Sequence, residues 1–202
     1  MQNASGNGED NAIAKLEDHL HYRFSHKALL VNALRHRSYV HENPEGLEDN
    51  ERLEFLGDAV LNLIVSHILM KRFPELTEGD LSRLRSGLVN ENRLAAAAKS
   101  IHLGRHLLLG KGEIQSMGHQ KSSILADTCE ALVAAVYLDG GFDCAFDLIQ
   151  HHFTPFFADL ESEEPVYDYK SRLQEYVQSQ HLEMPVYEII EEIGPDHDKT
   201  FS

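Results

Sequence analysis

The 202-residue sequence lacks several features that mark particular classes of protein. It has no tryptophan and only two cysteines, Cys129 and Cys144, which are too few for a disulfide framework. No continuous apolar run reaches the roughly 18 to 20 residues that cross a bilayer. The first ten residues, MQNASGNGED, have neither a basic start nor an apolar stretch, so no secretory signal is expected. These absences predict a cytoplasmic protein with reduced thiols and no membrane association.

Basic residues are also scarce, because 18 Lys and Arg stand against 33 Asp and Glu, for a formal net charge of -15. Residues 1–160 contain 15 basic and 22 acidic residues, whereas residues 161–202 contain 3 and 11. Proteins that bind nucleic acid are usually basic. An acidic protein can still bind a polyphosphate if part of its negative charge holds a cation, so the net charge alone does not decide the question.

The pattern of apolar residues predicts a mainly α protein in two parts. Residues 12–158 repeat apolar side chains at helical spacing and form a nearly all-helical unit. An acidic linker that contains a proline, residues 159–167, separates this unit from residues 168–202. In residues 168–202 one helical segment is followed by residues in which apolar and polar side chains alternate, which predicts an incomplete α+β module. The helices expected in the first part are two short ones within 11–40, one ending at Arg72, one from Thr77 to about Gly104, one from Ser123 to Leu138 and one after Gly141, with loops at 41–49 and 110–123.

Two of these helices contain acidic pairs among apolar residues. The pairs are Glu54 and Asp58 in NERLEFLGDAVLNLIV (50–65), and Asp127 and Glu130 in SSILADTCEALVAAVYLD (122–139). Spacings of four and three residues put each pair on one helix face. If the helices pack together, four carboxylates converge, which is unfavourable unless protons or a multivalent cation offset the charge. Oxygen ligands favour Mg2+ or Mn2+, cations that suit phosphodiester hydrolysis.

A simpler interpretation of the acidic pairs is also open. Amphipathic helices often have acids at this spacing on a solvated face, and a single pair would be explained in that way. Two pairs with apolar neighbours on several sides leave both interpretations standing.

The same segments resemble a known family. NERLEFLGDAVL (50–61) resembles the signature of ribonuclease III, the double-strand-specific endoribonuclease, and KSSILADTCEALVAAVYLDGG (121–141) resembles that family's second acidic motif. EGDLSRLRSGLV (78–89) is similar to the family's intermediate segment. Residues 168–202 are similar to the first half of a double-stranded RNA-binding domain, which is expected to be truncated. The resemblance runs in unbroken order from about residue 12 to residue 202.

The resemblance implies an all-helical nuclease domain that forms a homodimer and cuts both strands of double-stranded RNA in rRNA and mRNA processing. It implies Mg2+ as the cofactor, with Mn2+ as a substitute, and products with 5′-phosphate and 3′-hydroxyl ends. Glu54, Asp58, Asp127 and Glu130 would bind the metal, and Asp58 and Glu130 would be catalytic. The other roles that it implies are auxiliary acids at Glu51 and Glu78, a dimer contact at Phe55, and RNA contacts at Ser171, Gln174, Glu175, Gln178 and His197.

Alternatives remain open for single residues and for the whole chain. Phe55 would otherwise be a core aromatic residue, and Glu175 part of a solvated helix face. A non-catalytic RNA-binding protein on the same fold would be expected to lack one of the acids, and all four are present. A helical di-metal phosphohydrolase acting on small nucleotides would need histidine ligands and gives no reason for an RNA-binding module.

Overall fold

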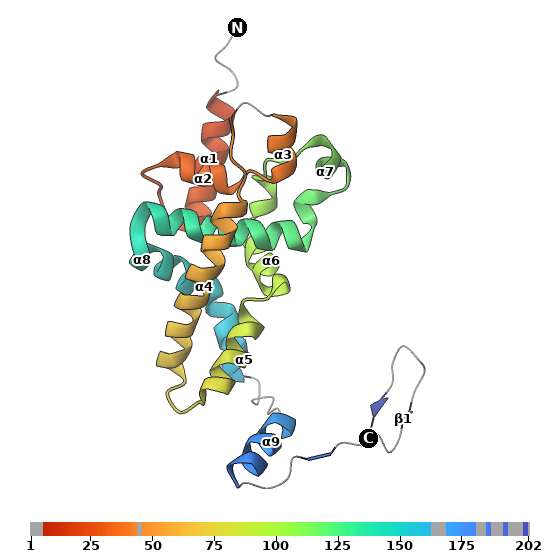
Figure 1. Cartoon of the computed structure of the whole chain (residues 1–202). Helices are drawn as coiled ribbons and strands as arrows, with labels where there is room; N and C mark the ends of the chain where they lie inside the picture. The colour runs from red at the N-terminus through yellow and green to blue at the C-terminus, as the bar shows by residue number, and fades with distance from the viewer. Residues whose placement is uncertain are drawn as a thin grey trace. The chain divides into compact units, whose positions relative to one another are not determined.

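The computed structural model describes residues 6–43, 46–162, 169–180, 185–186, 192–193 and 200–201. The chain divides into two compact units, residues 1–162 and 163–202. The described part of the second unit contains helix α9 (Tyr169–Ser179) and a short antiparallel pair, β1 (Glu192–Ile193) with β2 (Thr200–Phe201) (Figure 1). In this pair Glu192 lies opposite Phe201, and Ile193 opposite Thr200. The mainly α fold class predicted from the sequence is confirmed.

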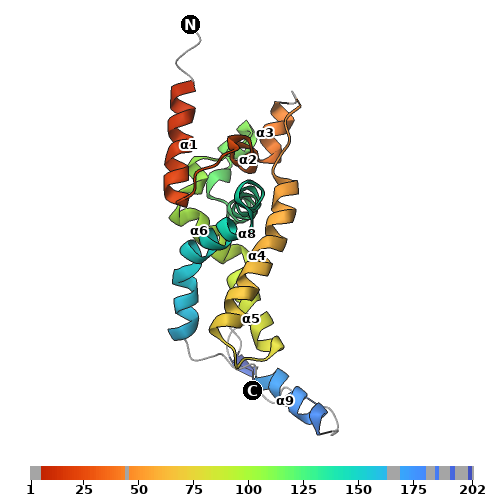
Figure 2. The same ribbon diagram turned by 90° about the vertical axis from the view of Figure 1, so that its left-hand side faces the viewer.

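The long helix α8 forms the centre of the first unit. It packs against α2, α4 and α6, and Figure 2 looks along its first half with these helices around it. Residues 131–136 of α8 are all buried, which explains why the apolar run in the sequence has no polar face. The helices of this unit are α1 (Gly6–Leu20), α2 (Lys27–Ala33), α3 (Arg37–Glu42), α4 (Glu51–Arg72), α5 (Glu78–Leu88), α6 (Glu91–Ser100), α7 (Lys111–Gln115) and α8 (Ser122–Ser162), with 3-10 turns η1 (Leu103–Arg105) and η2 (Gly118–Gln120).

Helix α4 supplies much of the remaining core. Leu61, Ile64 and Val65 are fully buried at helical spacing. Within the described ranges, α4 is also the one helix whose length and mean hydropathy, 1.6 over its most apolar stretch, would suit a membrane span. α4 is not a continuous apolar run, because Glu54, Asp58 and Asn62 interrupt it. Because α4 packs its buried residues against α8, we interpret it as a core helix.

The local sequence explains where the helices around α4 begin and end. α4 ends at Arg72, as predicted, and Thr77 caps α5 by accepting a hydrogen bond from the backbone N–H of Asp80 at 3.2 Å. The single helix expected from Thr77 to Gly104 is wrong, because two helices, α5 and α6, occupy this segment. Asn90 separates them, since its side chain accepts a hydrogen bond from the backbone N–H of Arg93 at 3.0 Å and so caps α6.

The expected break between two helices at Gly141 is confirmed, because α8 consists of two helical stretches that meet at a kink where Gly141 has a non-helical φ of 79° and ψ of -171°. Two other helix expectations need correction. The expected loop at 110–123 contains α7 and η2, and three helices rather than two precede α4. α8 also continues through Ser162, although the domain boundaries predicted at 12–158 and 168–202 stay predictions.

Candidate functional site

The two acidic pairs meet where α4 crosses α8. A Cβ atom at Gly57 would lie 1.9 Å from the backbone oxygen of Glu130, a distance that real Cβ atoms do not reach. The backbones of the two helices therefore touch, and only glycine allows this approach. Because Gly57 lies between Glu54 and Asp58 in the sequence, the crossing brings both α4 acids to the part of α8 that contains Glu130.

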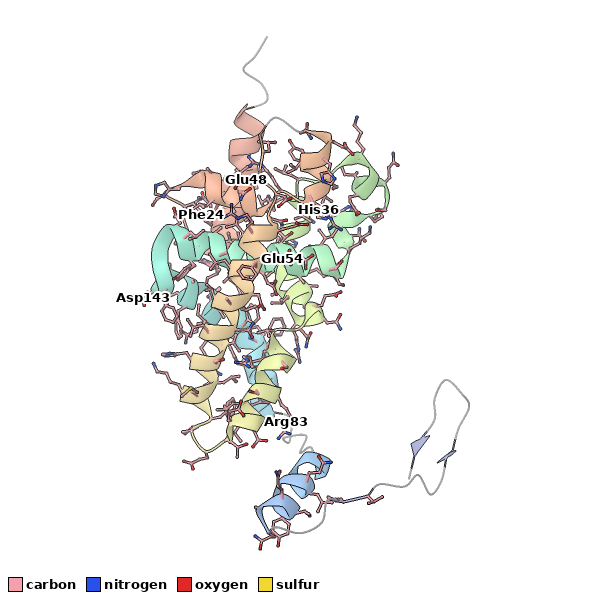
Figure 3. The ribbon with its side chains drawn as sticks, viewed as in Figure 1. Phe24, His36, Glu48, Glu54, Arg83 and Asp143 are labelled. Atoms are coloured by element: carbon pink, nitrogen blue, oxygen red, sulfur yellow. The ribbon has the colours of Figure 1, made fainter. Side chains whose placement is uncertain are left out.

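A cavity of about 480 Å³ opens beside this crossing. Glu51 and Glu54 of α4 line it together with Asp127 of α8, and Glu113 and Lys121 line it from the loop that contains α7. Figure 3 shows Glu54 on α4 in the part of the unit that faces α3 and α7. The cavity thus gathers side chains from segments that are far apart in the sequence.

Burial and neighbouring negative charge raise the pKa values of Glu54, Asp127 and Glu130. Burial, followed by the charges of Asp58, Glu54 and Asp127, raises the pKa of Glu130 from its usual 4.5 to about 7. Burial and the charge of Asp127 raise the pKa of Glu54, and burial with the charge of Glu91 raises that of Asp127. Without a cation, Glu130 is therefore protonated for much of the time at neutral pH.

These residues fit a hard divalent cation by their chemistry. All four predicted ligands offer carboxylate oxygens, which suit Mg2+ or Mn2+ rather than zinc. In the part of the chain that the structure describes, no three His, Cys, Asp or Glu side chains already stand close enough together to hold a metal ion. Asp58 instead accepts a hydrogen bond from the Asn62 side-chain amide at 2.7 Å. A cation held by these carboxylates would offset part of the negative charge around Glu130.

The structure treats the two predicted auxiliary acids differently. Glu51 lines the cavity and forms a 3.5 Å ion pair with Arg37, in which both side chains are more than half exposed. Glu78 begins α5, where it accepts a hydrogen bond from the Ser82 hydroxyl at 2.8 Å, and it is not among the residues that line the cavity. Within one chain, Glu78 therefore does not line the cavity with the other acids, and its role stays a prediction.

Phe55 lies on an exposed apolar face of α4. Its side chain is 82% exposed, which excludes the alternative of a core aromatic residue within one chain. Leu63 and Met70 are also exposed, and their spacing of eight and seven residues puts all three on one side of the helix. The contact of Phe55 with a second chain stays a prediction.

The predicted RNA-binding residues are only partly described. Ser171, Gln174, Glu175 and Gln178 all belong to α9, and their spacing puts them on one helix face. Gln174 is half-buried and Gln178 is exposed. His197 lies outside the described residues, and all five RNA contacts stay predictions.

The residues that line the cavity from outside α4 and α8 are not predicted by the sequence pattern. Glu113 and Lys121 belong to the segment predicted as a loop, and His36 and Arg37 lie at the start of α3. Figure 3 shows His36 on the same side of the unit as Glu54. The glycine-rich composition of residues 110–123 predicts a loop, but it does not indicate which of its side chains face the acids.

Two family models match the chain. A Ribonuclease-III-like model matches residues 26–156, which contain the cavity and all four carboxylates. A double-stranded RNA binding motif matches residues 169–202, which contain α9.

Curated proteins and solved structures are similar to the chain over most of its length. Ribonuclease 3 of Syntrophobacter fumaroxidans is 50% identical over 197 residues, which cover 95% of this chain and 81% of that protein. Ribonuclease 3 of Geobacter metallireducens is 48% identical over 193 residues, which cover 95% and 78%. The solved nuclease domain of ribonuclease III from Campylobacter jejuni has a TM-score of 0.68 at 42% identity, and the match covers 72% of this chain and 99% of that one.

Proposed function

This chain belongs to the ribonuclease III family of endoribonucleases, which act on double-stranded RNA, and we propose that it hydrolyses RNA with a divalent cation held by Glu54, Asp58, Asp127 and Glu130. The observation that supports the metal site is the meeting of two acidic pairs at the Gly57 crossing, where burial and then the neighbouring carboxylates raise the pKa of Glu130 to about 7. We further propose Mg2+ as the natural cation, products with 5′-phosphate and 3′-hydroxyl ends, and a cytoplasmic role in rRNA and mRNA processing.

The proposed role of the site's residues is to hold a cation, and so its positive charge, where the reaction takes place. A bound divalent cation supplies positive charge for the phosphate oxygens and lowers the pKa of water. The α4 and α8 carboxylates would hold this cation, and the backbone contact at Gly57 fixes the two helices that carry them relative to each other. Glu130 must be ionised to act as a ligand, so cation binding at neutral pH is expected to release a proton from its carboxyl group. No side-chain nucleophile is needed, because water attacks the phosphodiester.

The proposed RNA contacts extend this site to a larger substrate. The α9 face that contains Ser171, Gln174, Glu175 and Gln178 has the short polar side chains that suit the minor groove of A-form RNA, and His197 would contact the adjacent groove. The double-stranded RNA binding motif matched at 169–202 supports this assignment.

We also propose that the nuclease domain forms a homodimer through the α4 face that contains Phe55. The exposed Phe55, Leu63 and Met70 support an interface at this face, since large apolar side chains gathered on one helix face favour association. The solved Campylobacter jejuni structure concerns flexibility in a region involved in dimer formation. A dimer has two such sites, which suits cleavage of both strands.

Cleavage of a long RNA duplex with and without Mg2+ tests the proposed reaction. The unmodified protein is expected to cleave only with Mg2+, and Glu130→Gln to retain fold and duplex binding while losing on the order of 100-fold or more in turnover. Asp143→Asn is the matched control, because it removes an exposed carboxylate from the same helix α8 and should cleave at the normal rate. Duplex binding by the unmodified protein without cleavage at low salt would reject the nuclease and favour the non-catalytic alternative.

A further inference from the structure

The segment that contains α7 and η2, residues 110–121, forms one side of the cavity and is fixed to α3. The backbone N–H of Gly110 donates a hydrogen bond to the Ser38 hydroxyl at 2.9 Å, and that of Lys111 donates to the Glu42 carboxylate at 2.8 Å. A Cβ atom at Gly110 would lie 2.6 Å from the backbone oxygen of Ser38, so the two backbones are close. This segment, called the α7 segment below, is therefore positioned by backbone contacts with an element next to the acids.

Lys121 lies at the end of the α7 segment with its ammonium group held in place. Its Nζ donates to Glu113 Oε2 at 2.8 Å and to the Ser116 hydroxyl at 3.0 Å. A lysine ammonium has three donors, and these are the two acceptors that it has among the described residues. The hydrogen bond from Lys121, together with its charge, lowers the pKa of Glu113, so this carboxylate stays ionised and retains the lysine. One donor of Lys121 is therefore left for a ligand in the cavity that it lines.

The charges around the cavity explain why such a ligand needs a cationic side chain. An RNA phosphate is an anion, and carboxylates outnumber cationic side chains in the lining. The carboxylates are Glu51, Glu54, Glu113 and Asp127, and the Lys and Arg side chains are Arg37 and Lys121. A divalent cation would offset the charge on the side of α4 and α8. Phosphate oxygens that face the α7 segment need a different partner.

Lys121 is a better candidate than Arg37 for this partner of the phosphate. Arg37 is 64% exposed and pairs with Glu51 at 3.5 Å, a long contact at the surface. Lys121 is 40% exposed, and two short hydrogen bonds hold it. A side chain that is already held loses less conformational entropy when it binds a phosphate.

We propose that Lys121 is a substrate-binding residue that donates a hydrogen bond to a non-bridging oxygen of an RNA phosphate in this cavity, while Glu113 positions its ammonium group. The proposal rests on the function proposed above. It adds a contact supplied by a protein side chain to a site whose other proposed contacts with the phosphate pass through the cation.

The test compares Lys121→Met with Lys111→Met. Lys111 begins α7 and belongs to the same segment, but its side chain is exposed and is not among the lining residues of the cavity. Binding to an RNA duplex without divalent cation is measured over a series of salt concentrations. Lys121→Met is expected to weaken binding at low salt and to reduce the slope of log K against log salt by about one for each engaged site. Lys111→Met should keep the slope, and Lys121→Arg should restore it.

Single-turnover cleavage and folding complete the test. Lys121→Met should slow cleavage at subsaturating RNA by roughly tenfold, the effect of losing one charge-assisted contact, with the Mg2+ concentration for half-maximal rate unchanged. If the variant fails to fold in a thermal unfolding control, Lys121→Gln takes its place. A Lys121 variant that folds and matches the unmodified protein in slope and rate overturns this proposal alone. Absence of cleavage by the unmodified protein instead rejects the proposed function.

Discussion

Replacing Glu130 by glutamine is expected to stabilise the cation-free protein at neutral and alkaline pH. Burial and the charges of Asp58, Glu54 and Asp127 raise the pKa of Glu130 from 4.5 to about 7. A carboxyl group whose pKa is higher in the folded than in the unfolded protein binds its proton more tightly when folded. Its contribution to the free energy of unfolding is therefore full below pH 4.5 and is lost as the pH rises from about 4.5 to about 7.

The size of the effect follows from the difference between the two pKa values. Values of 4.5 and about 7 correspond to about 3 kcal/mol, at roughly 1.4 kcal/mol for each pH unit. Glu130 is only half-buried and lies among other carboxylates, so the measured gain should be smaller, about 1 to 2 kcal/mol. Glutamine keeps the shape and the helix propensity of Glu130 while removing its charge. The variant should gain this amount at pH 8 and nothing at pH 4.

Urea unfolding followed by circular dichroism at pH 4 to 8, with a chelator present, measures the gain. Asp143→Asn is again the control and should show no comparable pH-dependent gain. Adding Mg2+ should reverse the order, because a ligand that binds only the folded state stabilises the unmodified protein more than a variant that has lost a ligand group. A Glu130→Gln variant that is less stable than the unmodified protein at pH 8, or whose gain is the same at pH 4, would refute the argument that the ionised form of Glu130 is unfavourable at this crossing.

Three further predictions concern other parts of the first unit. Gly57→Ala should cost roughly 1 to 3 kcal/mol of stability in thermal unfolding and reduce cleavage more than binding, because its methyl group would overlap the backbone of Glu130; unchanged stability would contradict the close contact. Phe55→Asp should shift a dimer toward monomer in sedimentation velocity at equal concentration, and an unchanged distribution would place the interface elsewhere. Burial lowers the pKa of His106 and of His152, so stability in urea should fall as the pH drops below about 6.5 in the Glu130→Gln variant, where the opposing contribution of Glu130 is removed.

The acidic pairs could be predicted from the sequence because each pair is recognised from neighbouring residues in the chain. The spacing of Glu54 and Asp58, with apolar neighbours on several sides, is visible within two helical turns. Asp127 and Glu130 lie about seventy residues further along the chain, so their approach to the α4 acids is a tertiary contact. Gly57, which lies between the α4 acids, is the local feature that allows this contact. The family resemblance, not the helical periodicity, supplied that pairing.

Other parts of the site could not be predicted because they depend on tertiary contacts. Lys121 faces the cavity because hydrogen bonds from Gly110 and Lys111 fix the α7 segment to α3, and no local pattern records them. The break between α5 and α6 was missed for a different reason. Asn90 is a moderate helix residue in an otherwise helical sequence, and its action as a cap is decided by the chain that follows.

The contact at Gly57 also bears on how this sequence can change over time. In most of a protein core, a larger side chain on one helix can be balanced by a smaller one on its neighbour. At this crossing backbone meets backbone, so there is no side chain to exchange and no such balance is possible. The core residues of α4 and α8 can therefore change while the separation of the two acidic pairs stays constant, whereas position 57 is confined to glycine.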